Sequence, residues 1–222
     1  MEPLRVGDSY GGYRARLVEE LRDLGIRDMA VLAAVAQTPR HLFVPEALRN
    51  RAYENAALPI GKRQTISHPS THARNLEAVG LQGRERVLEV GTGSGYQTAL
   101  LSRLADQVIS IERIAALADL ARSALQEAGC VNVTVLVGDG TLGRRSLAPF
   151  DAIIVSAAGA SPPKPLIEQL ADGGRLVMPI CRDSGQELVK FTRTGDGLVE
   201  QSMGHVQFVP LLGKHGFEDE NS

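Results

Sequence analysis

The feature that most constrains this chain is an alternation of short β-rich runs with helical runs that begins near residue 86. The β-rich runs are 86–90, 107–112, 131–137, 151–157 and 175–180. Between them we expect a helix from Gly95, another that ends at Ala128 before Gly129, and a short one over 166–171. Strands separated by helices pair in parallel, with the helices packed on the sheet. The sequence therefore predicts an α/β fold with a mostly parallel, doubly wound sheet.

The regions on either side of this alternation have other patterns. Apolar residues at three- and four-residue spacing predict a helix over 13–24, and a second short helix follows Asp28 and ends before Pro39. Residues 39–69 show no sustained period, and a loop of that length usually has a functional role. The β-rich runs 187–193 and 198–203 flank a turn, so we expect an antiparallel hairpin at the far side of the sheet.

Length and composition limit the classes of function. The 222 residues, 43% of them hydrophobic, suffice for one domain, which we divide into N-terminal helices and active-site loop (1–80), cofactor-binding core (81–185), C-terminal strands (186–217) and a flexible tail (218–222). The net charge of -2 gives no field that would attract nucleic acid or a membrane surface. We expect a monomer.

Cysteine content and the N-terminal sequence predict the location. Cys130 and Cys181 form neither a disulfide framework nor a metal-ligand set, which favours a reducing compartment and no metal site. The first residues lack a signal-peptide pattern, and the longest apolar run, 29–36, is too short to span a bilayer. The expected location is the cytoplasm.

The glycine-rich run 87–97 joins the first strand to the next helix and indicates a nucleotide-type site. Its glycines are Gly91, Gly93 and Gly95. A dinucleotide-binding loop would have glycine three positions after Gly93, but Tyr96 stands there, which disfavours pyrophosphate and hence NAD.

Two acidic residues lie at the carboxyl ends of the next two strands. Glu112 ends the second strand, where a carboxylate can accept hydrogen bonds from both hydroxyls of a ribose. Asp139 follows the third strand and could accept from an adenine amino group. Alone, each would be an ordinary strand end or turn residue. Two carboxylates would repel a pyrophosphate but tolerate a cationic sulfonium, so the ligand we expect carries ribose and adenine without phosphate.

The order of these motifs resembles the class I methyltransferases. The segments that carry the resemblance are 87–97, 110–113, 138–140, 149–153 and 173–177. Further segments resemble the protein-L-isoaspartate O-methyltransferase family more narrowly, and these are 39–45, 52–55, 58–61, 64–67 and 206–211. The resemblance extends from the first helix to Gly216. It implies a Rossmann-like fold that uses S-adenosyl-L-methionine and acts on damaged proteins and peptides that contain L-isoaspartate. The methyl ester then collapses to a succinimide, which returns part of the material to aspartate.

The resemblance also implies site residues. Ser67 is the expected active-site residue, orienting the substrate carboxylate rather than acting as a nucleophile. The expected cofactor-binding residues are Thr65, Ile66, His72, Glu89, Gly91, Thr92, Gly93, Ser94, Gly95, Glu112, Arg113, Asp139 and Gly140. The expected substrate-binding residues are Pro59, Ile60, Ile66, Ser67, Val206, Phe208 and Val209, with 208–210 as a strand that holds substrate backbone.

Three residues depart from the family pattern. Arg63 replaces a glycine before the Thr-Ile-Ser segment, His68 stands where glutamine or alanine is more usual, and Cys181 where glycine is frequent. We expect these changes to alter the substrate entrance and not the cofactor site. Alternative functions are methylation of a normal aspartate in a biosynthetic peptide, methylation of a small molecule, and ligand binding without turnover.

Overall fold

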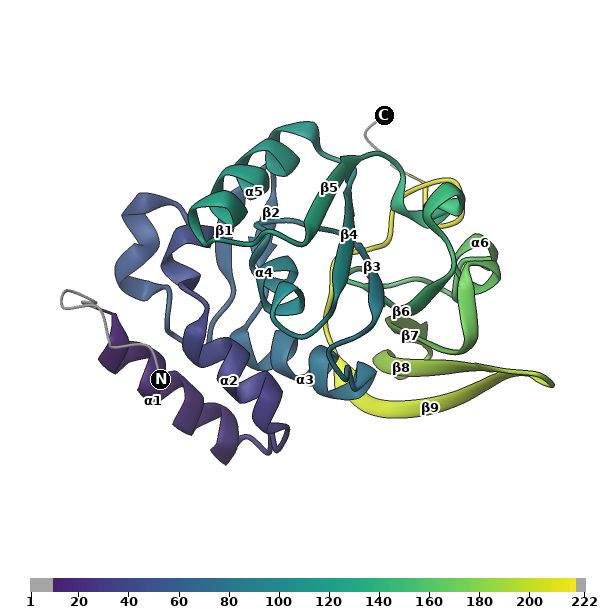
Figure 1. Ribbon diagram of the computed structural model, residues 1–222, viewed down its shortest axis with the longest axis horizontal. Coiled ribbons are helices and arrows are strands. Elements are labelled where there is room, and N and C mark those ends of the chain that lie inside the picture. Colours follow the sequence, from purple (N-terminus) through teal and green to yellow (C-terminus); the bar gives the residue numbers. More distant parts are fainter. Residues whose placement is uncertain (1–9, 219–222) are drawn as a thin grey trace.

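A seven-stranded sheet forms the centre of the protein, in a computed structural model that describes residues 10–218 (Figure 1). The strands lie in the order β5-β4-β3-β6-β7-β8-β9. Their bounds are β3 (Arg86–Val90), β4 (Gln107–Glu112), β5 (Val133–Val137), β6 (Phe150–Val155), β7 (Leu170–Arg182), β8 (Gly185–Thr194) and β9 (Gly197–Val206). Neighbours from β5 to β7 are parallel, whereas β7-β8 and β8-β9 are antiparallel. The predicted fold class is confirmed.

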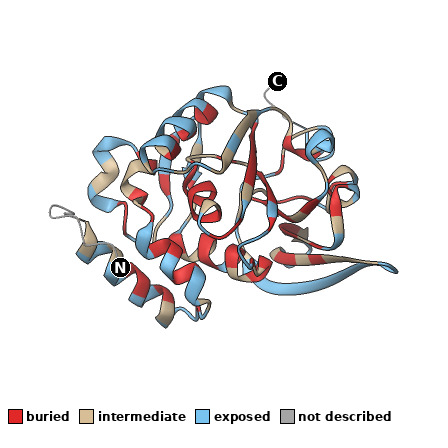
Figure 2. Ribbon diagram, in the orientation of Figure 1, coloured by how far each residue is buried: buried red, intermediate tan, exposed pale blue. Residues whose placement is uncertain are grey.

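Two hydrophobic cores lie on opposite faces of this sheet, since successive strand residues point to opposite sides. Val87 and Val108 belong to one cluster, to which helices α1 to α5 contribute, while Leu88 and Ile109 belong to the other, to which Leu166 of α6 contributes. The helices are α1 (Gly11–Asp23), α2 (Met29–Gln37), α3 (Pro69–Val79), α4 (Tyr96–Ser102), α5 (Ala115–Glu127) and α6 (Lys164–Glu168). Both faces are therefore covered, although unequally. Figure 2 shows the buried residues concentrated in the central strands, whereas β9 is exposed along almost all its length.

Local sequence explains where several helices begin and end. The Asp28 side chain accepts hydrogen bonds from Ala30 N and Val31 N, which caps α2. Pro69 occupies the first turn of α3, where its missing N–H costs nothing. Gly80 ends α3 in the left-handed conformation, with φ of 63°.

The loop predicted over 39–69 contains more regular structure than expected. It holds two short 3₁₀-helices, η1 (Arg40–Phe43) and η2 (Glu46–Arg51), and an antiparallel pair, β1 (Leu58–Gly61) and β2 (Gln64–Ile66). The turn between β1 and β2 places Lys62 and Arg63 at φ of 50° and 58°. Both residues thus adopt the left-handed region that normally favours glycine. These strands were missed because three and four residues are too few to show a period.

Three further boundaries differ from the predictions. The predicted helix over 166–171 is wrong in its second half, because Leu170 begins β7 and pairs with Phe150. Val131 is 94% exposed and precedes β5, which begins at Val133. Residues 207–209 form no strand, and Pro210 makes only an isolated bridge to Ala158, so the strand predicted over 208–210 is wrong.

Two predictions concern the whole chain. No helix within residues 10–218 is long and apolar enough to cross a membrane. The predicted flexible tail, 218–222, lies outside the described residues except for Glu218.

Candidate active site

A cavity of about 800 Å³ opens at the carboxyl ends of β3, β4 and β6. Ligands in open α/β sheets bind at this edge, because the loops that leave parallel strands converge there. The cavity wall consists of five groups of segments. These are residue 57 with residues 63–68 and 70–72, residues 90–94 and 97 at the glycine loop, residues 111–114 and 117 after β4, residues 140 and 156–157, and residues 207–212.

The glycine loop follows β3 with backbone angles that only glycine adopts readily. Gly91 and Gly93 have φ of 94° and 55°, and a Cβ on Gly93 would point at Ile60, 3.7 Å away. Thr92, between them, makes a hydrogen bond of 2.5 Å from its hydroxyl to that of Ser110. The loop is therefore held close to β4 and presents its backbone to the cavity.

Glu112 holds the glycine loop while it lines the cavity. Its Oε2 accepts from Gly93 N at 2.8 Å and its Oε1 from Ile114 N at 2.9 Å. A carboxylate oxygen has two acceptor positions, so each oxygen keeps one for a ligand. This arrangement is compatible with the predicted pair of hydrogen bonds from a ribose.

Asp139 lies beside the cavity rather than on its wall. Its side chain accepts from Thr141 N, from the Thr141 hydroxyl and from Lys214 N, at 2.9, 2.6 and 2.8 Å. Burial opposes ionisation of Asp139, but these hydrogen bonds prevail and lower its pKa. Most of its acceptor capacity is thus used within the protein, and Gly140 is the residue of this turn that lines the cavity. The contact with adenine that we expected for Asp139 stays a prediction.

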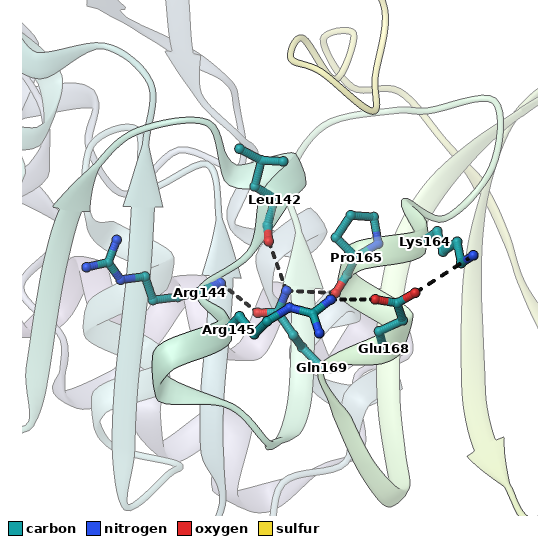
Figure 3. A network of polar contacts seen from close by, with 7 residues as sticks. All are labelled: Leu142, Arg144, Arg145, Lys164, Pro165, Glu168 and Gln169. Carbon is teal, nitrogen blue, oxygen red and sulfur yellow. Dashed lines mark hydrogen bonds and ion pairs between the residues drawn. The ribbon is translucent and has the colours of Figure 1, made fainter.

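A buried glutamine fixes the loop that follows Asp139 (Figure 3). Gln169, 2% exposed, accepts from Arg144 N at 2.6 Å and donates to the carbonyl oxygens of Leu142 and Pro165, at 2.8 and 2.7 Å. A Cβ at Gly143 would come within 2.5 Å of the Gln169 amide oxygen. The close packing of this glycine on Gln169 therefore sets the path of the loop on which Gly140 lies.

A hydrogen-bonded chain from Glu89 to His72 lies beneath the glycine loop. Gln97 donates through Nε2 to Glu89 at 3.1 Å and to Ser156 at 2.8 Å. This leaves Oε1 of Gln97 facing His72 Nδ1, at a distance of 3.1 Å. Because an amide oxygen can only accept, the proton of the imidazole is on Nδ1. Burial and the charge of Arg40 lower the pKa of His72 to about 3, which keeps the ring neutral.

His72 consequently presents an unprotonated Nε2. This atom is buried and has no hydrogen-bond partner within residues 10–218, while His72 itself lines the cavity. Glu89, by contrast, is fully buried and does not reach the cavity wall. Its carboxylate instead accepts from Gln97, Thr98 and Ser110, and its expected part in cofactor binding stays a prediction.

Ser67 lies on the cavity wall between β2 and α3. No hydrogen bond of its hydroxyl occurs within the described part of the chain, so the hydroxyl is available to a ligand. Its backbone is fixed by Arg40, which donates to the carbonyl oxygens of Ser67 and Ala52, both at 2.8 Å. The Arg40 guanidinium is fully buried and lies 4.6 Å from the centre of the Tyr96 ring. Burial lowers the pKa of Arg40 to about 10, and the side chain stays charged at neutral pH.

The remaining wall comes from the end of the sheet. Phe208 and Val209 line the cavity, and Ala158 holds their segment by donating to Val209 O and accepting from Leu211 N, both at 2.8 Å. Val206, Pro59 and Ile60, expected to bind substrate, do not reach the wall. Ile60 lies behind Gly93 instead.

Most of the predicted site residues meet at this one cavity. Those on its wall are Thr65, Ile66, Ser67, His72, Gly91, Thr92, Gly93, Ser94, Glu112, Arg113, Gly140, Phe208 and Val209. Those away from it are Pro59, Ile60, Glu89, Gly95, Asp139 and Val206. Of the residues that depart from the family pattern, Arg63 and His68 line the cavity and Cys181 does not.

Ser156, Leu117 and Gln97 also line the cavity. Sequence reasoning missed the first two as site residues and did not predict that Gln97 connects Glu89 to His72. Ser156 follows β6, the strand beside β3, so its place at the carboxyl edge of the sheet was a usable signal.

Comparison with known proteins agrees with this geometry. A family model described as protein-L-isoaspartate(D-aspartate) O-methyltransferase matches residues 13–216. The chain belongs to the protein-L-isoaspartate O-methyltransferase family. Relatives of that name from Syntrophus aciditrophicus and Dictyoglomus thermophilum are each 49% identical, over 95% of this chain and 98% and 96% of their own length.

Solved structures of the family are also similar. One protein-L-isoaspartate O-methyltransferase superimposes with a TM-score of 0.82 and 29% identity, covering 91% of this chain and 67% of that one. A Plasmodium falciparum beta-aspartate methyltransferase in complex with S-adenosyl-L-homocysteine gives a TM-score of 0.79 and 26% identity, over 90% of this chain and 98% of its own. The family fold therefore extends over nearly the whole described chain.

Proposed function

We propose that this protein transfers the methyl group of S-adenosyl-L-methionine to the free α-carboxylate of L-isoaspartyl residues in damaged proteins and peptides. The observation that carries the proposal is the hydroxyl of Ser67, which has no partner among the described residues and lies on the wall of a cavity that the glycine loop and Glu112 also line. The names of the relatives and the S-adenosyl-L-homocysteine bound in the Plasmodium structure support it.

The residues of the cavity fit the cofactor. A volume of about 800 Å³ is within the usual range for such sites, ~300–1,000 Å³. Glu112 would hold the ribose hydroxyls, and its negative charge favours a sulfonium cation nearby. His72 Nε2, a buried acceptor without a partner among the described residues, suits an N–H donor such as the ammonium group of the cofactor.

The chemistry requires alignment more than proton transfer. When bound, S-adenosyl-L-methionine supplies an electrophilic methyl group. The substrate carboxylate is ionised at neutral pH and needs no general base, in agreement with a neutral His72 that has little basicity. Ser67 would donate a hydrogen bond to one carboxylate oxygen and leave the other to attack. Holding reactants in such an arrangement is worth about 7–11 kcal/mol.

Substrate choice tests the proposal. An isoaspartyl residue differs from aspartate by one methylene moved from side chain to backbone, so contact alone separates the two by only ~1–3 kcal/mol. If the wall at 207–210 and the Ser67 loop grip the peptide backbone, the normal side chain arrives displaced, and ~1 Å of displacement can cost a hundredfold in rate. We expect kcat/KM for an L-isoaspartyl peptide to exceed that for its L-aspartyl twin by at least about a hundredfold. Equal values, or preference for aspartate, would reject the assignment in favour of aspartimide formation.

The cytoplasmic location and the monomeric state are proposals as well. Size-exclusion chromatography with light scattering measures the second, and a mass near 23.8 kDa is expected.

A further inference from the structure

The cavity wall formed by residues 207–210 has no neighbouring strand along most of its length among the residues that the structure describes. β9 ends at Val206, and beyond it, within residues 10–218, only Ala158 forms a bridge to the segment. A glutamine takes the place of the missing strand. Gln186 accepts from Phe208 N at 2.7 Å and donates to Phe208 O at 3.0 Å, so its amide bonds both backbone groups of one residue as an adjacent strand would.

Gln186 is well placed to hold this segment rigidly. Its own backbone lies in β8, paired with Cys181 of β7 on one side and with Val206 of β9 on the other. The side chain is half-buried and reaches past the end of β9. The wall is therefore fixed at two consecutive residues. The Gln186 side chain holds Phe208, and the Ala158 backbone holds Val209.

The bonds to Gln186 also decide which backbone groups are left for a ligand. Phe208 N–H and C=O are occupied, and Val209 C=O is bound to Ala158. Within residues 10–218, the C=O of Gln207 and the N–H of Val209 have no hydrogen-bond partner. Both residues line the cavity, and a peptide in extended conformation needs such groups to pair.

We infer that Gln186 is a positioning residue for peptide recognition: by clamping the Phe208 backbone it sets the distance between the 207–210 wall and Ser67. This inference rests on the proposed function, because that distance matters only if a peptide lies between the two. Gln186 does not line the cavity, so it would act through the Phe208 backbone that it holds. Its contribution is selective for substrates long enough to reach the wall.

The test compares two isoaspartyl substrates in Gln186→Met, which keeps the size of the side chain and removes both hydrogen bonds. The long substrate has several residues on each side of the isoaspartyl unit, and the short one has a single blocked neighbour. We expect kcat/KM for the long peptide to fall about 10- to 100-fold, mainly through KM, since a shift of about 1 Å has effects of that size. The short substrate should change by less than about threefold. S-adenosyl-L-methionine affinity, measured by calorimetry, should stay at the wild-type value.

Two further variants sharpen the test. Gln186→Glu replaces the donor with a carboxylate oxygen that faces the Phe208 carbonyl oxygen, so it should lose kcat/KM for the long peptide at least as strongly as Gln186→Met. Gln201→Met is the matched control, because Gln201 is exposed on the neighbouring β9 and its side chain makes no hydrogen bond in the described chain. This control should match wild type on both substrates.

The outcomes separate the inference from the proposed function. Wild-type kinetics of Gln186→Met on the long peptide would overturn the inference, and so would an equal loss on both substrates or a parallel loss of cofactor affinity, which would mark a general structural role. If the wild-type protein methylates neither isoaspartyl substrate, the proposed function itself fails.

Discussion

Replacing Glu89 with glutamine should change how the stability of the protein depends on pH. Glu89 is fully buried, and burial raises its pKa to about 7, with the charge of Glu112 adding to the rise. Hydrogen bonds from Ser110, Thr98 and Gln97 oppose the rise but do not cancel it. In the unfolded chain the same carboxyl group has a pKa near its ordinary value, about 4.5.

The sign follows from proton binding. Between about pH 4.5 and pH 7 the folded protein holds a proton on Glu89 that the unfolded chain has lost, so this group makes the protein less stable as the pH rises. A pKa of about 7 against about 4.5 corresponds to a loss of about 2–3 kcal/mol between pH 5 and pH 8. A glutamine in place of Glu89 would carry no charge, and the Ser110 and Thr98 hydroxyls can rotate to accept from its amide.

Urea unfolding at about pH 5 and pH 8 measures the effect. The free energy of unfolding of Glu89→Gln minus that of wild type should increase by about 2–3 kcal/mol from the lower to the higher pH. Glu20→Gln, at an exposed position of α1, should follow wild type at both. A Glu89→Gln difference that is flat with pH, or that decreases, would refute the reasoning that burial governs this carboxyl group.

Three other substitutions address the site. Ser67→Ala should lower kcat on an isoaspartyl peptide about tenfold or more while calorimetry finds cofactor affinity unchanged, because the hydroxyl is assigned to the substrate; wild-type turnover would make Ser67 a bystander. Glu112→Ala should weaken S-adenosyl-L-methionine binding, since two hydrogen bonds to a charged acceptor, each worth roughly 1.5–3 kcal/mol, are lost; undiminished affinity would remove Glu112 from the site. Arg40→Met should lower kcat at least about tenfold, because it releases the Ser67 backbone. The free energy of unfolding in urea should change by no more than about 3 kcal/mol, since the lost hydrogen bonds are offset by removal of a buried charge. Full activity of this variant would show that the Ser67 loop holds its own position.

The sheet could be predicted because its strands carry strong local signals. The run 107–112 coincides with β4, and both its faces are buried, which produces the continuous apolar character of a parallel strand. β7 was predicted too short because its first residues include Gly173 and Gly174, which resemble a loop although Leu170 already pairs with β6. Pairing with an existing strand there overrides local preference.

The site was predicted less completely, for a physical reason. Residues that follow strands, such as Gly91 and Glu112, reach the cavity because the sheet itself places them. Asp139 was expected to face the ligand, but the N–H of Lys214, distant in sequence, takes up part of its carboxylate. Gln186 and Arg40 act on backbone groups far along the chain, and no spacing of residue types reveals such contacts.

The wall formed by residues 207–212 also fixes when the site is completed during synthesis. The glycine loop, Glu112, Ser67 and Ser156 have all left the ribosome once residue 157 has emerged. The last wall requires residue 212, about 55 residues later, which is a delay of ~3–11 s at ~5–20 residues per second. β7 and β8, which contribute Val177 and Leu188 to the core, also emerge during this interval. Because a domain generally folds as a unit, the cavity takes its final shape only when the whole chain folds.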